Sequence, residues 1–180
     1  MGAGPRSRFV EIYESVYEPI LGYVLRRCPH PEDAADVVAE TFTTAWRRID
    51  ELPEGDEARL WLYGVARRVL ANHRRGEERH EQRTAALRER LAAFPALARS
   101  PEDEMSQMGK VFRGLSDDDR ELLSLVAWEA LDHGQIARVL GISRNAVRIR
   151  LYRARRRFAR DLAKAGFDHP RAVALEGSPL

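Results

Sequence analysis

The chain has 180 residues, of which 44% are hydrophobic and 32% are charged. This apolar content is ordinary for a folded protein and excludes disorder throughout the chain. The formal net charge is only +2 although the isoelectric point is near 8.9, so the positions of the basic residues carry more information than their total.

Cysteine usage and hydropathy narrow the class of protein. Cys28 is the single cysteine, which excludes an intramolecular disulfide and a zinc site built from several cysteines. No stretch approaches the roughly 20 apolar residues that span a bilayer, and the first residues lack the apolar segment of a signal peptide. We therefore expect a cytoplasmic protein without membrane insertion.

Two helices are expected in the first 50 residues. Apolar residues recur every three to four positions over 9–24, which is the period of one helix face. Pro19 inside this run predicts a kink or a break, because proline removes a backbone donor. A second helix is expected to open at Pro31, and Asp36 and Glu40 lie on an acidic face outside its apolar stripe.

A third helix is expected after the loop at residues 52–55, which contains a proline and a glycine. Trp46 and Trp61 lie among apolar residues at helical spacing, so we interpret them as core side chains and not as platforms for base stacking. The third helix becomes basic at its end, where a cluster of polar side chains gathers: Arg67, Arg68, Asn72, His73, Arg74 and Arg75.

The middle of the chain is rich in alanine and charge and contains Pro95 and Pro101. We interpret residues 80–110 as a linker that is helical in part, and the acids that follow Pro101 leave open whether a short helix begins there.

Cap residues indicate a further domain after the linker. Ser116 precedes acidic residues and an apolar run, Asp132 is followed three positions later by Gln135, and Gly141 and Ser143 provide a helix stop and a new helix start. This order predicts a supporting helix followed by a helix-turn-helix.

The predicted fold is all-α, with two small helical domains joined by a linker and a C-terminal helix-turn-helix. The predicted boundaries are 1–79 for the N-terminal domain, 80–110 for the linker, 111–165 for the helix-turn-helix domain and 166–180 for a C-terminal tail.

The last helix combines one apolar stripe with a basic surface. Val147, Leu151, Ala154 and Phe158 recur on one face, and eight arginines lie within 144–160. Arginine favours helices, and cations in a last turn complement the helix dipole. Here, however, the positive charge begins in the first turn, where it opposes the dipole, so a negative partner such as DNA is expected.

Such a helix can enter a major groove with its N-terminal residues at the base edges. Arg144, Asn145 and Arg148 are the predicted base readers, because arginine pairs with guanine and asparagine with adenine. The other arginines, including Arg157, are expected to contact phosphate or solvent. The candidate DNA-binding residues of this helix are Arg144, Asn145, Arg148, Tyr152, Arg153 and Arg155.

No catalytic constellation is visible in the sequence. The five histidines show no metal-ligand spacing, and neither a phosphate-binding glycine loop nor a serine nucleophile motif is present. We expect no enzymatic activity, no metal and no cofactor.

Three segments resemble motifs of one family. Residues 140–155, Leu-Gly-Ile-Ser-Arg-Asn-Ala-Val-Arg-Ile-Arg-Leu-Tyr-Arg-Ala-Arg, resemble the promoter-reading motif of extracytoplasmic-function (ECF) sigma factors, which belong to the sigma-70 family of bacterial RNA polymerase subunits. Residues 31–46 are similar to that family's polymerase-binding helix. Residues 61–75 resemble its reader of the minus-ten promoter element, and the order of the motifs matches the family from about residue 9 to residue 160.

The resemblance implies a factor that directs promoter-specific transcription initiation by binding core RNA polymerase and the minus-ten and minus-thirty-five elements of promoter DNA. It implies that Asp36 and Glu40 dock on core polymerase, although a solvated acidic face is the alternative. Ala39 stands where the family often has glutamine, and Arg68 where it often has asparagine. The residues implied at the minus-ten element are Arg68, Asn72, His73, Arg74 and Arg75.

Other implications concern partners and rival functions. The family resemblance implies an anti-sigma factor as a partner, and it raises RNA mimicry by the acidic residues 102–104 as an alternative to solvated linker charge. One rival is a helix-turn-helix regulator that acts independently of core polymerase. Another is a helical adaptor that binds only protein, which would leave the arginines of the last helix unexplained.

Overall fold

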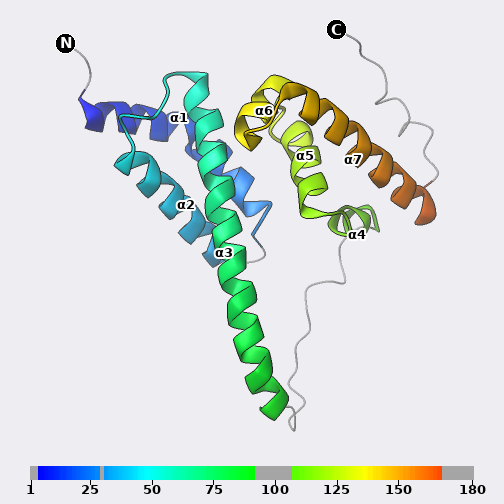
Figure 1. The fold of residues 1–180 in the computed structure, drawn as a ribbon. Coiled ribbons are helices and arrows are strands. Elements are labelled where there is room, and N and C mark those ends of the chain that lie inside the picture. The colour runs from blue at the N-terminus through cyan, green and yellow to red at the C-terminus, as the bar shows by residue number, and fades with distance from the viewer. Residues whose placement is uncertain (1–3, 29–30, 92–106, 168–180) are drawn as a thin grey trace. The chain divides into compact units, whose positions relative to one another are not determined.

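The computed structural model describes residues 4–28, 31–91 and 107–167, and every regular element within them is an α-helix (Figure 1). Side chains are described for these residues except 31, 77–91 and 107. The chain divides into two compact units. The N-terminal unit contains α1, α2 and α3, and the C-terminal unit contains α4, α5, α7 and the greater part of α6. The predicted all-α class with two helical domains is confirmed for the described residues.

The N-terminal unit begins with α1, Pro5–Leu25, and α2, Pro31–Arg47. Of the kink or break predicted at Pro19, the break does not occur, because α1 runs through this residue. Val16 and Ile20, on either side of it, are buried, and this packing holds the helix together despite one missing backbone donor. The second helix opens at Pro31, as its position in the sequence predicted.

An aromatic cluster joins α1 to α2. The ring centroids of Tyr13 and Phe42 lie 4.7 Å apart, and those of Phe9 and Trp46 lie 5.3 Å apart, both in edge-on geometry. Tyr17 extends the cluster, with its centroid 6.1 Å from that of Phe42. Trp46 is nevertheless 47% exposed, so its interpretation as a core side chain is wrong. It lies in the last turn of α2, where part of the ring packs against Phe9 of α1.

The third helix is longer than its amphipathic pattern suggested. It spans Asp56–Leu91 (Figure 1), and the apolar side chains Leu62, Ala66, Val69 and Leu70 are buried. Residues 80–91 of the expected linker are therefore helical, in line with the expectation that the linker is helical in part. Residues 92–106, with both linker prolines and the acids at 102–104, lie outside the described residues.

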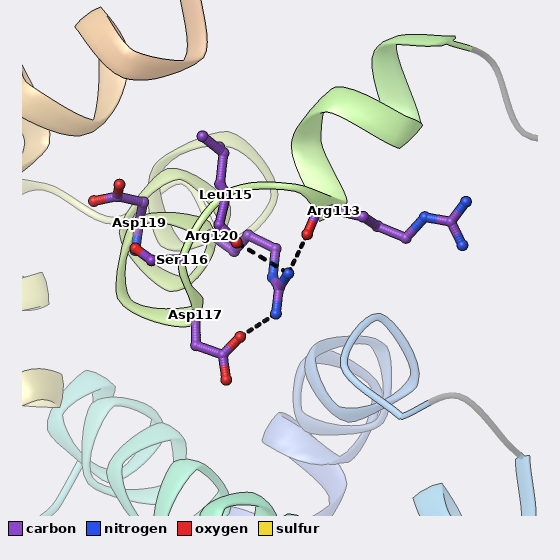
Figure 2. A network of polar contacts seen from close by, with 6 residues as sticks. All are labelled: Arg113, Leu115, Ser116, Asp117, Asp119 and Arg120. Carbon is purple, nitrogen blue, oxygen red and sulfur yellow. Dashed lines mark hydrogen bonds and ion pairs between the residues drawn. The ribbon is translucent and has the colours of Figure 1, made fainter. Parts of the chain in front are cut away.

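Within residues 107–167 the structure describes four helices: α4, Gln107–Arg113; α5, Asp117–Ala127; α6, His133–Leu140; and α7, Arg144–Lys164. A single side chain fixes the turn between α4 and α5. The Arg120 guanidinium donates to the carbonyl oxygen of Arg113, to that of Leu115 at 3.1 Å and to the Asp117 carboxylate (Figure 2). The first helical residues of α5 are thereby tied to the end of α4.

The predicted caps of these helices are confirmed. The Ser116 hydroxyl accepts the Asp119 amide at 3.3 Å, and the Ser143 hydroxyl accepts the Ala146 amide at 3.1 Å. Asp132 forms a capping box with the residue three positions later, Gln135. These bonds satisfy amides that the first helical turn leaves without a backbone partner.

The turn between α6 and α7 depends on glycine. Gly141 ends α6 with φ of 67°, a left-handed conformation that glycine adopts without steric strain. Only Ile142 and Ser143 then separate this residue from α7. The result is the short, glycine-containing turn of a helix-turn-helix.

Candidate nucleic-acid interface

Helix α7 presents opposite surfaces to the protein and to solvent. Val147, Leu151 and Ala154 are at most 1% exposed, and Phe158 packs edge-on against Phe112 with ring centroids 5.8 Å apart. The predicted stripe therefore forms the inner face. Of the six residues predicted to contact DNA, Arg155 is half-buried. The other five are exposed: Arg144, Asn145, Arg148, Tyr152 and Arg153.

Two of the predicted base readers are joined to each other. The Arg148 guanidinium donates from Nη2 to Oδ1 of Asn145 at 3.0 Å, across one helical turn. This bond limits the rotamers of both side chains and holds the arginine over the first two turns of α7.

Further along α7, the arginines border a surface concavity. Its walls are formed by Tyr152, Arg153, Arg156, Arg157 and Arg160. The Arg156 guanidinium lies 5.8 Å from the centroid of the Tyr152 ring, within the range of a cation–π contact. Two of these arginines are paired with carboxylates, Arg157 with Asp119 and Arg160 with Asp161, so the positive charge of the concavity is partly compensated.

One arginine of this helix has a structural role that the sequence did not predict. The Arg157 guanidinium donates from Nε to Oδ2 of Asp119 and from Nη2 to Oδ1, both at 2.5 Å. Asp119 lies in the first turn of α5, and its side chain is 6% exposed. The Arg157 side chain reaches solvent, at 42% exposed, and its guanidinium also supplies the charged partner that a buried carboxylate requires.

This ion pair is bidentate and sets how α7 lies on α5. Hydrogen bonds from Arg157 hold the pKa of the Asp119 carboxyl below its ordinary value, against the opposing effect of burial. The sequence placed Asp119 only in an acidic first turn. Its partner lies 38 positions away, a separation at which helical periodicity gives no information.

The basic end of α3 also divides into two groups. Arg68, Asn72 and Arg75 are exposed, and their spacing of four and three residues places them on one face. The Arg75 guanidinium donates to Oδ1 of Asn72 at 2.5 Å. His73 lies elsewhere, with Nε2 at 3.7 Å from Oδ1 of Asp33 in α2. One side of the His73 ring therefore faces α2.

Two of the acidic residues of α2 lie on its outer side. Asp36 and Glu40 are exposed, one turn apart, while the neighbouring positions Val37 and Val38 are buried.

Within the described residues, no three His, Cys, Asp or Glu side chains lie close enough to hold a metal ion. None of the helices that the structure describes is long and apolar enough to cross a membrane.

The fold and the charged faces define a class: a helical protein of two units that carries a helix-turn-helix with a basic outer surface. Family comparison refines this class. Residues 12–80 match the model for Sigma-70 region 2, and residues 106–158 match the model for Sigma-70, region 4. The two matches cover more than half of the chain.

Individual relatives give the same result. RNA polymerase sigma factor YlaC of Bacillus subtilis is 26% identical over 166 residues, which cover 89% of this chain and 95% of the relative. ECF RNA polymerase sigma factor SigC of Mycobacterium tuberculosis is 32% identical over 123 residues, which cover 68% of this chain and 66% of the relative. The solved structure of sigma factor RpoE in complex with the anti-sigma factor NepR, from Bartonella quintana, has the same fold, with a TM-score of 0.65 at 22% identity and coverage of 89% of this chain and 98% of that chain.

The chain belongs to the sigma-70 family of RNA polymerase sigma factors, in its ECF group. It is accordingly a transcription-initiation factor, which acts at promoters as a subunit of RNA polymerase. A helix-turn-helix regulator independent of the polymerase is not favoured. The family match includes region 2 in the N-terminal half as well as the helix-turn-helix of region 4.

Proposed function

We propose that this sigma factor reads the minus-thirty-five element with the first two turns of α7. The observation that carries the proposal is the exposed face at the start of this helix, where Arg144, Asn145 and Arg148 all lie on the surface. Arginine and asparagine are the side chains that pair bidentately with guanine and adenine in the major groove. Tyr152, Arg153 and Arg155 follow along the helix and supply contacts to the flanking backbone.

We propose a second DNA contact at the basic end of α3. Arg68, Asn72 and Arg75 share an exposed face of this helix, and a positive, polar face suits the phosphates and unstacked bases of a melted minus-ten element. Arg74 adds charge at the same end. His73 is assigned a supporting role, because its ring lies 3.7 Å from the carboxylate of Asp33.

The acidic face of α2 is the proposed contact with core polymerase. Asp36 and Glu40 are exposed, and neither belongs to the apolar packing of the N-terminal unit. We infer that the factor acts in the cytoplasm, where its polymerase works, that it needs no cofactor, and that polymerase performs the chemistry. An anti-sigma factor is a further proposed partner, supported by the relative RpoE, which was solved with NepR.

Run-off transcription tests the proposed function. Core polymerase is assembled with the full chain and supplied with a library of promoters randomised at both elements. We expect transcripts from a subset of sequences that share one minus-ten and one minus-thirty-five element. A chain that binds no core polymerase and selects no promoter would contradict the proposal.

Glu40→Lys tests the acidic face. We expect at least a tenfold weaker affinity for core polymerase, because like charges would then meet at an interface that requires an acid. Glu18→Lys makes the same charge change at an exposed position of α1 and serves as the matched control. Equal losses for the two variants would show a general effect of charge and reject docking through α2.

Arg148→Ala tests base reading by α7. We expect the preference at one promoter position to weaken by about 1–3 kcal/mol, the contribution of one bidentate pair. Asn145→Ala should weaken the same position, because the Asn145 side chain orients Arg148, and the double variant should lose less than the sum of the two. Arg150→Ala, at another exposed arginine of α7, is the control and should affect all sequences alike. A uniform loss for Arg148→Ala would reject the assignment.

A further inference from the structure

An exposed isoleucine lies among the charged residues of the recognition helix. Ile149 is 41% exposed, although it is apolar and follows directly after Arg148. Scattered apolar residues on a surface need no explanation. Ile149 differs because Tyr152, 51% exposed, lies one turn away on the same helix, so the two form an apolar strip within an otherwise basic surface.

Helix geometry places this strip at the outermost part of α7. Each residue advances about 100° around the axis, so Ile149, two positions from both Val147 and Leu151, points about 160–200° away from the buried face. Asn145 precedes it by one turn on the same side. Ile149 therefore lies along the centre of the face that, in the proposed function, enters the groove, and it lies within the first two turns of the helix.

The chemistry of this side chain selects one feature of the groove. It can neither donate nor accept a hydrogen bond, so phosphate oxygens and the polar base edges gain nothing from it. The C5 methyl group of thymine is the apolar group that base pairs present in the major groove, and apolar side chains contact it. Ile149 is also branched at Cβ, which restricts χ1 and keeps its methyl groups in a fixed place before DNA arrives.

We propose that Ile149 is a specificity-determining residue that contacts the methyl group of a thymine in the minus-thirty-five element. The inference rests on the proposed function, since it needs α7 in the major groove. It adds an apolar contact to the hydrogen-bonding readers Asn145 and Arg148. Since Ile149 lies one turn beyond Asn145, the thymine belongs to a base pair next to those that the polar pair reads.

Replacing thymine by uracil in the DNA tests this contact, because uracil lacks only the methyl group. The probe is the promoter selected by the library, with each thymine of the minus-thirty-five element replaced in turn, and the measurement is the Kd of the assembled holoenzyme. We expect uracil at one position to weaken binding about fourfold, the factor that corresponds to burial of one methyl-sized group. Ile149→Ala should weaken binding to the thymine promoter and should remove the difference between thymine and uracil.

Two controls separate this contact from other effects. Met108 on α4 is similarly exposed, at 48%, and Met108→Ala should leave the uracil effect intact. The slope of log Kd against log salt should not change in Ile149→Ala, because the substitution removes no charge. Circular dichroism and the thermal transition check that the variant folds, and Ile149→Val, which keeps the Cβ branch, provides a milder change that should retain part of the effect.

The outcomes distinguish the inference from the proposed function. A wild-type holoenzyme that selects no minus-thirty-five element would reject the proposed function itself. If an element is selected, the inference alone is overturned in three cases: no uracil substitution weakens binding, the same loss persists in Ile149→Ala, or the element has no thymine. Loss of an anti-sigma contact in Ile149→Ala with unchanged thymine preference would also overturn it, since Ile149 would then face a protein.

Discussion

Both units of this sigma factor join their helices through aromatic contacts, and the C-terminal unit adds a buried ion pair. In the N-terminal unit, α1 and α2 meet through a cluster of aromatic rings that includes Tyr13 and Phe42. Among the described residues, the buried carboxylates are Asp119 and Glu129, both in the C-terminal half, and Asp119 pairs with Arg157 of α7. Aromatic faces tolerate small shifts, whereas a bidentate ion pair requires one geometry. The stricter contact fixes the orientation of α7, the helix that is proposed to read DNA.

The largest expected loss of stability comes from the aromatic cluster that joins α1 to α2. Phe42 is 6% exposed, and Phe42→Ala should destabilise the N-terminal unit by about 3–5 kcal/mol, through lost burial and a residual cavity. Hydrogen exchange resolved by segment measures each unit separately. Phe42→Leu is the control and should cost less. If amides of the C-terminal unit lost protection to the same extent, the two units would not be independently stabilised.

On the side of the ion pair, Arg157→Ala should destabilise the C-terminal unit by about 1–2 kcal/mol. The loss arises because the substitution leaves a buried acid without its partner. It is kept small because Arg157 is half-exposed and its charge is screened by solvent. DNA affinity should fall without a change in its salt slope, because Arg157 is engaged within the protein. The matched control is Arg156→Ala, at the neighbouring exposed arginine, which should change the slope and not the stability. If Arg157→Ala changed the salt slope and not the stability, Arg157 would be a phosphate contact.

Low pH should lower the stability of the C-terminal unit by a smaller amount than these substitutions do. Because the folded pKa of Asp119 is below its ordinary value, the ion pair contributes stability fully above the unfolded pKa, near 4, and loses it as pH falls through the folded pKa. The C-terminal unit should therefore weaken below about pH 4, and Asp119→Asn should remove this part of the pH dependence. Fluorescence of single-tryptophan variants that keep Trp61 or Trp128 follows each unit. An unchanged pH profile in Asp119→Asn would argue against the pair.

The smallest expected effect concerns one backbone position. Ala130 has φ of 51°, a left-handed conformation that alanine adopts only with strain. Ala130→Gly should stabilise the C-terminal unit by about 0.5–1 kcal/mol, since relief of strain exceeds the added freedom of the unfolded chain. The midpoint of urea unfolding measures this change. Ala127→Gly, inside the last turn of α5, is the control and should destabilise instead.

Local signals in the sequence predicted the C-terminal unit well. A cap requires only residues within one turn of each other, so Ser116, Asp132 and Ser143 could be assigned to helix starts from spacing alone. The inner stripe of α7 follows from the 3.6-residue period in the same way. Family resemblance added the functional class, which charge and spacing could not supply.

Other features depended on contacts between distant segments. The pairing of Asp119 with Arg157 and the edge-on packing of Trp46 are set by how helices lie on each other, and the continuity of α1 through Pro19 is set by packing on both sides of the proline. Periodicity gives the direction in which a side chain points but not what it meets. The assignment of the DNA-reading and polymerase-binding residues remains a prediction for the same reason.

The bond between Asn145 and Arg148 has a consequence for the kinetics of promoter recognition. A free arginine loses up to about 2 kcal/mol of rotamer entropy when it is immobilised, and the hydrogen bond to Asn145 restricts Arg148 before DNA binds. A side chain ordered in advance costs less to immobilise in a complex, so a matching promoter should be held for longer. We therefore expect Asn145→Ala to shorten the lifetime of the promoter complex more than it slows its formation.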